Sequence, residues 1–492
     1  MNNLLTDFYE LTMGQAYFKS KVSNNNAVFD IFFRKCPDGG SFAIANGMAD
    51  ILEYLKNWTL TKEDIDYLKS LNQFTPDFLD EIENIKFTGD MWAVEDGTVV
   101  FPNEPVVTIK APLLEAQLVE TALLNMFNHS SLITTKASRI VRAAKGRPVM
   151  EFGTRRAQGE NAAVQGAREA IIAGCKGTAC TVAGKNYGIK VLGTMAHSFV
   201  QYFDTEYEAF KQYALAFPDD CSLLVDTYNT LKSGIPNAIR VHNEVLKPMG
   251  KSLKGIRIDS GDLAYLSKQA KAMLYNAGIK DAKIIISNAL DEKVIESLLD
   301  QGAPIDSFGV GENLITAKSD PVFGGVYKLV AIEKEHKLIP KIKISDNPEK
   351  TTNPAFKKIF RFYDENGMFI TDEIALFNET TPMGKHEFVH PEMPFRKKEI
   401  TNFTVKDLKV KMIENGKQIY TVPTIANTAK HVQDELKTLW EEAQRLENPH
   451  KYYISLSKKL TALKNEMLFG NKEKDNQTNH HDSFQTNLTK ER

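Results

Sequence analysis

Short apolar runs between residues 149 and 314 repeatedly end in a polar or glycine-rich tip. The later runs, around Val225, Arg257 and Ile286, are separated by about the thirty residues that one strand, loop and helix of a barrel occupy. The tips read EFGTRR (151–156), GTMAHS (193–198), LVDTYNT (224–230), IRIDSGD (256–262), ISNALDE (286–292) and FGVGENL (308–314). This pattern predicts an α/β fold of the (β/α)8-barrel type, whose chemistry is built from the C-terminal ends of several strands.

The stretches between the tips have helical periodicity. After the fourth tip, apolar residues starting at Leu263 and Leu266 recur at three- and four-residue intervals, and Gly278 stands where a helix would end. The next stretch repeats the plan, with Asp291 as its cap and Gly302 at its end. An open, doubly wound sheet also alternates strands with helices and is the alternative, but we favour the barrel.

The remaining chain predicts an α+β domain built from the N-terminal and C-terminal regions. Residues 92–112 are rich in valine and proline, which indicates short strands joined by turns. Residues 359–376 and 410–422 each place Asn-Gly between alternating strands, a strong hairpin signal. We expect an N-terminal α+β domain (1–125), the barrel (126–340), a C-terminal hairpin and helix region packing on the N-terminal domain (341–470), and a disordered polar tail (471–492).

Composition narrows the class of protein. The chain has 492 residues, of which 25% are charged and 42% hydrophobic, as in ordinary globular proteins. Its net charge of −2 offers no broad basic field for nucleic acid, and no apolar run is long enough to cross a bilayer. The N-terminus lacks the pattern of a secretion signal, and the spacing of Cys175 and Cys180 is too wide for a zinc knuckle. We expect a cytoplasmic enzyme without a structural metal.

Several segments together resemble the nicotinate phosphoribosyltransferase family of type II phosphoribosyltransferases. They are TDFYELTM (6–13), EFGTRRAQG (151–159), GTMAHSF (193–199), LLVDTYNT (223–230), GIRIDSGDL (255–263), ISNALDE (286–292), FGVGENL (308–314) and GGVYKL (324–329). The hairpin-rich region after residue 340 resembles the family's C-terminal part more loosely. The resemblance implies condensation of nicotinate with phosphoribosyl pyrophosphate to nicotinate mononucleotide and pyrophosphate, assisted by ATP hydrolysis and Mg²⁺. This reaction is the first step of NAD salvage from nicotinate.

Phosphate groups in such a reaction need backbone amides and small hydroxyls close together. Gly309 and Gly311, with Thr316 beyond them, stand at the late-barrel position where this fold often binds phosphate. A bare G-x-G also occurs in an ordinary tight turn, so the motif alone does not decide between the two explanations.

The ribose needs carboxylates for its hydroxyls and for a magnesium bridge, because positive charge develops on the sugar as the bond breaks. Asp226, Asp259 and Ser260 stand at strand ends and suit this task, although helix capping also explains the DSGD segment. Arg257 lies in an apolar strand, where a charge is costly unless it is paired. By resemblance, Arg257 contacts the pyridine carboxylate or the nearby phosphates.

The resemblance also implies how nicotinate is held. Phe152 would stack on the ring and Arg155 would pair with anions, while Tyr9 and Asp7 would come from a partner subunit and make the enzyme a homodimer. Core packing of Phe152 and an amphipathic helix capped by Asp7, with Glu10 at its third position, are the plain structural alternatives. The substrate-binding set is completed by residues of the same motifs: Thr178, Thr194, Ser198, Thr227, Gly261 and Asn288.

His197 is the candidate for coupling to ATP. A lone histidine is usually a core or surface residue, but His197 follows Gly193 and Thr194 at a strand end. By resemblance this histidine is phosphorylated by ATP, which requires one ring nitrogen to be free while the other is held by a hydrogen bond. The sequence does not show which residue holds it.

The residue at position 179 helps to decide whether the substrate is nicotinate or nicotinamide. Nicotinamide phosphoribosyltransferase carries an aspartate where GTAC places Ala179, and such a carboxylate would repel nicotinate by about 4 kcal/mol at 4 Å and intermediate dielectric. Its absence favours nicotinate over nicotinamide, and a quinolinate enzyme would need a denser basic site. A catalytically idle barrel that binds a phosphorylated metabolite and a phosphate-binding isomerase are alternatives from other classes.

Overall fold

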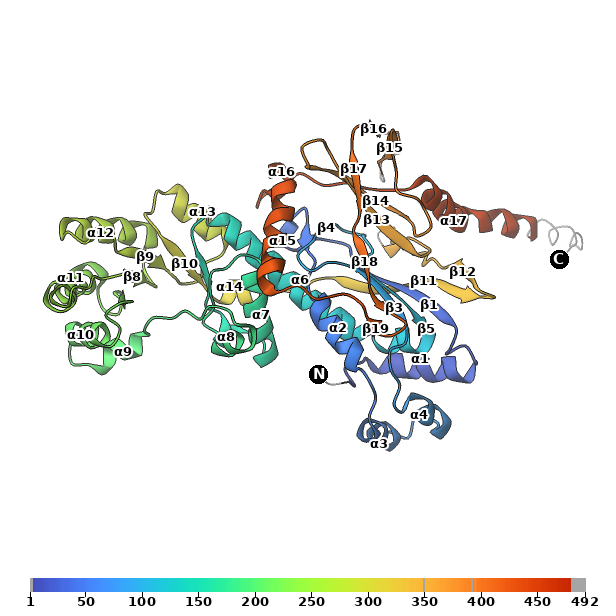
Figure 1. The fold of residues 1–492 in the computed structure, drawn as a ribbon, viewed down its shortest axis with the longest axis horizontal. Helices are drawn as coiled ribbons and strands as arrows, with labels where there is room; N and C mark the ends of the chain where they lie inside the picture. Colours follow the sequence, from blue (N-terminus) through green and yellow to red (C-terminus); the bar gives the residue numbers. More distant parts are fainter. Residues whose placement is uncertain (1–2, 348–349, 391–392, 394, 479–492) are drawn as a thin grey trace, which may run out of the picture.

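The computed structural model describes residues 3–347, 350–390, 393 and 395–478. The molecule is elongated, with a parallel sheet and its helices at one end and a mixed set of sheets at the other (Figure 1). Helix α6 (Glu120–Ala143) contacts elements of both ends, including α7, α13, α2 and β11. The boundary predicted at residue 125 falls inside this helix.

The larger sheet has seven strands in the order β12-β11-β1-β5-β3-β18-β19, with antiparallel neighbours. Its strands are β1 (Asn26–Phe33), β3 (Asp90–Val94), β5 (Val107–Pro112), β11 (Gly325–Lys334), β12 (Lys337–Pro340), β18 (Lys409–Glu414) and β19 (Lys417–Gln418). Since β11 and β12 pair beside β1, residues 325–340 belong to this sheet and not to the barrel segment in which the sequence placed them. The neighbouring helices are α1 (Phe8–Lys19), α2 (Met48–Asn57), α3 (Lys62–Ser70), α4 (Pro76–Ile82) and α5 (Leu113–Leu118).

The second sheet has five parallel strands in the order β6-β10-β9-β8-β7. They are β6 (Val149–Glu151), β7 (Ser222–Leu224), β8 (Gly255–Ile258), β9 (Lys283–Ile286) and β10 (Ser307–Val310). Parallel bridges from Glu151 to Thr178 and from Thr178 to Val191 continue the sheet beyond β6. The expected α/β organisation is confirmed. Among the described residues, the Val191 segment does not pair with β7, as a closed barrel would require.

Helices follow the parallel strands as the periodicity predicts. They are α7 (Glu160–Ile172), α8 (Thr181–Tyr187), α9 (His197–Tyr202), α10 (Glu206–Ala216), α11 (Ile235–Val241), α12 (Leu263–Asn276), α13 (Glu292–Asp300) and α14 (Glu312–Ile315). The predicted cap of α13 is confirmed, because the Asp291 carboxylate accepts a hydrogen bond from Val294 N at 2.8 Å. Gly278 and Gly302 follow α12 and α13 with φ of 79° and 72°, the left-handed region in which glycine carries no Cβ penalty.

The C-terminal region forms another sheet in the order β17-β13-β14-β20, together with short two-stranded ladders. The strands are β13 (Lys357–Tyr363), β14 (Phe369–Leu376), β15 (His386–Val389), β16 (Lys397–Ile400), β17 (Thr404–Asp407) and β20 (Ile454–Leu456), with β2 (Ala43–Ile44) and β4 (Val99–Val100) pairing nearer the N-terminus. Both hairpins predicted at Asn-Gly are confirmed, since β13 pairs with β14 and β18 with β19. Here the helices are α15 (Ile425–Thr438), α16 (Glu441–Gln444) and α17 (Lys458–Thr478).

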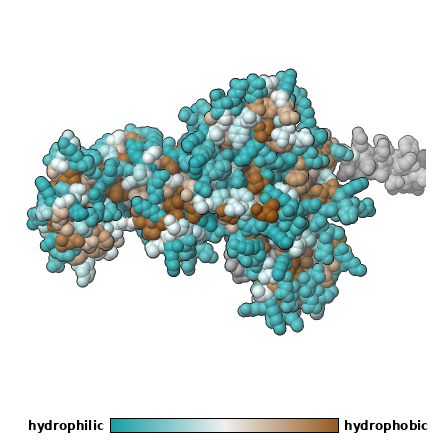
Figure 2. Space-filling model, in the orientation of Figure 1, coloured by the Kyte–Doolittle hydropathy of each residue, from teal (hydrophilic) through white to brown (hydrophobic). Residues whose placement is uncertain are grey.

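Helix α17 runs past the boundary predicted at residue 470, and residues 479–492 of the expected tail lie outside the described residues. Short helical turns complete the fold, namely the 3-10 turns Pro37–Gly39, Thr154–Arg156 and Lys247–Met249 and the π-turns Thr230–Gly234 and His242–Leu246. Among the described residues, no helix has the length and apolar character that crossing a membrane would demand. Hydrophilic residues cover most of the face seen in Figure 2, with smaller hydrophobic areas between them.

A buried cluster of charges joins the two ends of the molecule. Lys136 on α6 donates to Glu292 at the start of α13 at 2.8 Å and to Asp38 at 3.0 Å. Arg139 on the same helix donates to Glu292 at 2.9 Å and to the Leu446 carbonyl at 3.0 Å. Because buried charges need partners on all sides, this cluster fixes the parallel sheet against the rest of the chain.

Candidate functional site

Arg257, at the end of β8, connects side chains from three of the predicted tips. Its Nε donates to Ser287 Oγ at 2.7 Å, and its guanidinium also donates to Thr194 Oγ1 at 3.2 Å and to Asp259 Oδ1 at 3.1 Å. The side chain is 15% exposed, so its charge is largely removed from water and depends on these partners. Thr194 and Ser287 are 93 positions apart in the sequence. Both bind Arg257 at one edge of the parallel sheet, as the strand pattern predicts.

Two carboxylates lie beside this arginine. Asp226 Oδ2 accepts hydrogen bonds from the Asp259 backbone N at 2.9 Å and from Ser260 Oγ at 2.6 Å. Ser287 Oγ also donates to Asp259, so that this carboxylate has both a serine and an arginine as partners. Asp226 Oδ1 is buried and has no hydrogen-bond partner among the described residues. A buried carboxylate oxygen left in this way is available to a cation or a ligand hydroxyl.

His197 is the first residue of α9 and remains partly exposed. Its Nδ1 lies 3.1 Å from Thr227 Oγ1, in the tip that follows β7, and its Nε2 lies 3.9 Å from Asp259 Oδ2. The contact with Thr227 fixes one ring nitrogen by a hydrogen bond, and the other nitrogen faces the Asp259 carboxylate. Thr227 therefore answers the question of which residue orients His197.

Phe152 follows β6 and lies against β10. Its backbone N donates to Val310 O at 2.7 Å, and a Cβ built on Gly309 would stand 2.6 Å from the Phe152 ring. The Arg257 guanidinium carbon lies 5.9 Å from the centre of the same ring. Gly309 is thus explained by close approach of an aromatic ring, which any larger side chain would displace. Gly311 is also restricted, since its added Cβ would lie 3.1 Å from Phe152 O.

A buried glutamate directly precedes this aromatic residue, and the sequence pattern did not identify it as part of the site. Glu151 is fully buried, accepts a hydrogen bond from Gly153 N, and accepts another from Thr178 Oγ1 at 2.5 Å. Burial raises the pKa of its carboxyl. Thr178 is itself fully buried and accepts from Cys180 N at 2.9 Å, so its hydroxyl hydrogen is committed to Glu151. The role of Thr178 as a direct hydrogen-bond donor to substrate is therefore corrected to a supporting one.

Glu151 and Ser287 were missed for different reasons. Glu151 could have been identified from the sequence, because an acidic residue that ends an apolar strand needs a partner. Ser287 lay inside a recognised tip but carried nothing that distinguishes a site serine from a turn serine.

Other predicted residues lie around the same rim without side-chain contacts that define a role. Arg155, Ser198, Gly261 and Asn288 are exposed there, and Gly261 and Asn288 have φ of 82° and 95°. Thr316 Oγ1 donates to the Glu312 carbonyl at 2.8 Å, which ties it to the end of α14.

Asp7 and Tyr9 lie on α1, which Figure 1 shows in the other half of the molecule from β8 and β9. Asp7 occupies the cap position of α1, yet its side chain makes no capping hydrogen bond within the described residues. Glu10 is instead buried and accepts from the Thr121 backbone N at 3.1 Å. The expected cap by the Asp7 side chain is therefore wrong, and within one chain Asp7 and Tyr9 do not join the rim.

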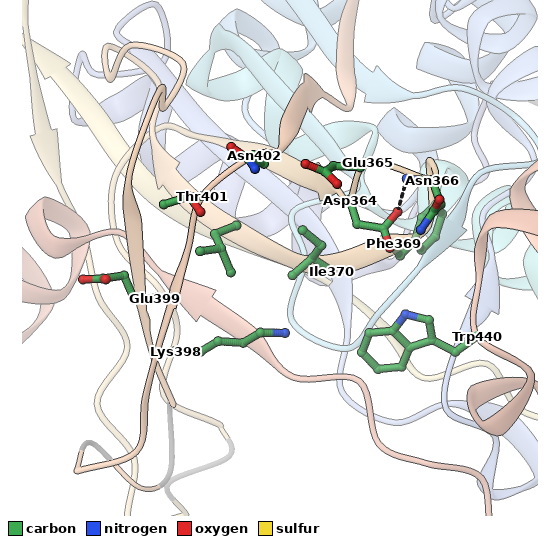
Figure 3. A pocket seen from close by; sticks show the side chains of 11 residues that line it. Asp364, Glu365, Asn366, Phe369, Ile370, Lys398, Glu399, Thr401, Asn402 and Trp440 are labelled. Atoms are coloured by element: carbon green, nitrogen blue, oxygen red, sulfur yellow. Dashed lines mark hydrogen bonds between the residues drawn. The ribbon is translucent and has the colours of Figure 1, made fainter.

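Several cavities of the described residues lie away from this rim. One of about 540 Å³ is bordered by the β13–β14 turn, β16 and Trp440 (Figure 3). Its Asp364 carboxylate accepts from the backbone N of Asn366 at 2.9 Å and of Met368 at 2.8 Å, which explains that side chain as part of the turn. Likewise, the described part of the chain holds no group of three or more His, Cys, Asp and Glu side chains placed to bind a metal ion.

Comparisons with known proteins agree over nearly the whole chain. Three family models match: the nicotinate phosphoribosyltransferase N-terminal domain over residues 4–128, the nicotinate phosphoribosyltransferase family over 148–368, and its C-terminal domain over 356–464. The chain is 44% identical to nicotinate phosphoribosyltransferase of Bacillus subtilis over 459 residues, covering 92% of this chain and 93% of that protein. It is 34% identical to the Caenorhabditis elegans protein of the same name, covering 93% and 92%. The crystal structure of human nicotinic acid phosphoribosyltransferase superposes with a TM-score of 0.84 at 28% identity, covering 94% of this chain and 100% of that one.

Proposed function

The chain belongs to the nicotinate phosphoribosyltransferase family, and we propose that it condenses nicotinate with 5-phosphoribosyl 1-pyrophosphate to nicotinate mononucleotide and pyrophosphate. This reaction begins the salvage of NAD from nicotinate. The observation that carries the proposal is the hydrogen-bonded set of Arg257, Asp259, Ser287 and Asp226 at the C-terminal ends of the parallel strands, with His197 Nε2 3.9 Å from Asp259. These strands would form an incomplete barrel, continued beyond β6 by the bridges at Thr178 and Val191.

The carboxylates of Asp226 and Asp259 interact with the ribose. As pyrophosphate leaves, positive charge develops on the ribose, and Asp226 and Asp259 supply negative charge where it appears. Ser260, held to Asp226 at 2.6 Å, offers a hydroxyl beside them. Mg²⁺ bound with the substrate would neutralise the leaving pyrophosphate. It prefers one or two carboxylates plus phosphate oxygens, and the unpartnered Asp226 Oδ1 with neighbouring Asp259 fits that preference better than a cage of protein ligands would.

Nicotinate is held by its ring and by its charge. Phe152 provides one wall of the slot, and Arg257, 5.9 Å from the ring centre, answers the carboxylate or the adjacent phosphates. Arg155 adds a second, exposed cation, while Thr194, Ser198, Gly261, Asn288 and Thr316 border the same rim. Gly309 and Gly311 allow phosphate oxygens to approach backbone amides in addition to making room for Phe152.

ATP acts through His197. Thr227 holds Nδ1, which leaves Nε2 as the nucleophile toward the γ-phosphate of ATP. The N–P bond forms at Nε2 as the bond between the γ-phosphorus and the bridging oxygen breaks, and ADP leaves with that oxygen. The phosphorylated histidine stands beside Asp226 and Asp259, where hydrolysis after turnover would reset the enzyme.

The active enzyme would be a homodimer. Tyr9 is 46% exposed on α1 with its hydroxyl bonded to Glu120, and Asp7 is exposed beside it, so both present surface to a second chain. A second chain that brings α1 to the rim would cover the face of nicotinate opposite Phe152. We place the reaction in the cytoplasm, in keeping with four cysteines that are all free thiols.

A pyrophosphate-release assay with nicotinate and nicotinamide side by side tests the proposal. We expect strong preference for nicotinate, because Ala179 places no carboxylate against the acid. We also expect stimulation by ATP, loss of that stimulation in His197→Ala with basal turnover partly retained, and acid-labile, base-stable phosphate on the protein after incubation with labelled ATP. Equal use of the amide would overturn the argument from Ala179, and ligand binding without pyrophosphate release would identify a non-catalytic phosphometabolite-binding protein.

A further inference from the structure

The turn after β9 has a backbone conformation that ordinary residues avoid. Asn288 has φ of 95° and Ala289 has φ of 30°, two consecutive non-glycine residues in the left-handed region. Asparagine tolerates this region because its side chain can form local hydrogen bonds. Alanine has no such side chain, and its Cβ is crowded by the backbone. Such a turn persists only where its surroundings hold it in place.

Asn313, on a different strand-end loop, supplies this support. It lies in α14, two residues after Gly311, and its Nδ2 donates to the carbonyls of Ala289 and Leu290, each at 3.0 Å. A side-chain amide has two N–H donors, so one Asn313 side chain can satisfy both carbonyls. The loop after β10 is in this way fastened to the turn after β9.

The held turn lies directly beside the site. Ser287, immediately before Asn288, has its Oγ 2.7 Å from Arg257 Nε and donates to Asp259. On the other side of the turn, Asp291 caps α13 by accepting from Val294 N at 2.8 Å. A change of φ at Ala289 would therefore move Ser287 relative to Arg257 and Asp259, because α13 is fixed behind it.

We propose that Asn313 is a positioning residue, which holds residues 288–289 in the left-handed conformation and so keeps Ser287 against Arg257 and Asp259. The proposal deepens the proposed function and rests on it, since Arg257 and Asp259 are there assigned to the phosphates and the ribose. Asn313 itself touches the loop and not the reacting atoms.

Asn313→Ala removes both donors without adding charge. We expect kcat/KM for phosphoribosyl pyrophosphate to fall about tenfold, the effect of losing two hydrogen bonds in a half-buried position. Glycine at position 289 adopts a positive φ without a Cβ penalty, so Ala289→Gly alone should change kcat/KM little. Combined with Asn313→Ala, it should raise kcat/KM about threefold or more above the value of Asn313→Ala alone. Asn57→Ala is the matched control, because Asn57 Nδ2 also donates to two oxygens, both of Glu53 and at 2.8 and 2.7 Å, on the distant helix α2.

Hydrogen exchange measured on the apo full-length protein separates this inference from the proposed function. The Ser287 amide, which donates to Ile258 O at 3.1 Å, should exchange about tenfold faster in Asn313→Ala than in wild type, with unchanged exchange in the Asn57→Ala protein. Unchanged exchange at Ser287 overturns the positioning role whether or not the protein releases pyrophosphate. An activity loss that Ala289→Gly fails to restore also overturns it, because that result assigns Asn313 to direct contact with substrate. A wild-type protein that releases no pyrophosphate refutes the proposed function while leaving the exchange result intact.

Discussion

Thr227 Oγ1 lies 3.1 Å from Nδ1 of His197, and the two residues come from different loops of the parallel sheet. This contact sets which nitrogen of the imidazole remains exposed. It also links the histidine to the tip that carries Asp226, one residue before Thr227. The orientation of His197 and the placement of the Asp226 carboxylate thus depend on one short segment.

Thr227→Val removes the hydroxyl and keeps the shape of the side chain. We expect the rate of His197 phosphorylation by ATP to fall by about tenfold, because the imidazole loses the hydrogen bond that fixes its orientation. Thr227→Ser, which restores the hydroxyl, should recover most of the rate. Phosphate incorporation from labelled ATP measures the effect, and equal incorporation in the valine and serine variants would show that Thr227 does not orient the histidine.

Gly309→Ala tests the close approach of Phe152 to β10. A Cβ at this position would stand 2.6 Å from two ring carbons, so the ring must move out of the slot. We expect KM for nicotinate to rise about tenfold or more, with a smaller effect on phosphoribosyl pyrophosphate, because the displaced group is the aromatic wall. Gly324→Ala is the control, since its added Cβ meets no atom of the described residues within 4 Å. An unchanged nicotinate KM would exclude Phe152 as that wall.

Subunit complementation tests the contribution of α1 to a neighbouring site. Tyr9→Ala damages the site that α1 completes, whereas His197→Ala damages the site on its own chain. Co-expression should form hybrid dimers in which one of two sites is intact, restoring about a quarter of the wild-type ATP-stimulated rate. Two Tyr9→Ala chains, or two His197→Ala chains, should lack this rate. A co-expressed mixture no better than its two parents would place both residues in the same chain's site.

The strand-end pattern predicted which side chains meet better than it predicted how the strands divide between the sheets. Arg257 and Asp259 could be foreseen because a charge within an apolar strand must find partners, and the structure brings them together with Asp226. By contrast, β11 continues directly from the parallel part of the chain yet pairs with β1, about 300 residues earlier, and no local pattern encodes such a long-range pairing. The sequence did not predict the irregular edge of the parallel sheet, because Val191 forms a single bridge where a strand leading into the GTMAHS tip was expected.

The last prediction concerns pH and the helix α1. Burial raises the pKa of Glu10 from 4.5 to about 7, despite hydrogen bonds from Thr121 and Thr6 that lower it. The folded protein therefore holds a proton on Glu10 that the unfolded chain has released between about pH 4.5 and pH 7. The Glu10 contribution to the free energy of unfolding should fall as pH rises through this window and stay at its low value above it.

Glu10→Gln keeps a neutral side chain at every pH. Urea unfolding of the wild-type protein and this variant at pH 5, 6, 7 and 8 should give a difference in unfolding free energy that grows in favour of glutamine up to about pH 7 and then levels off. Glu53→Gln on the exposed surface of α2 is the control and should track wild type at each pH. A Glu10→Gln difference independent of pH would mean that Glu10 ionises in the folded protein as it does in the unfolded chain. Because α1 also carries Asp7 and Tyr9, the same window should appear in the pH dependence of dimer activity if α1 completes the partner's site.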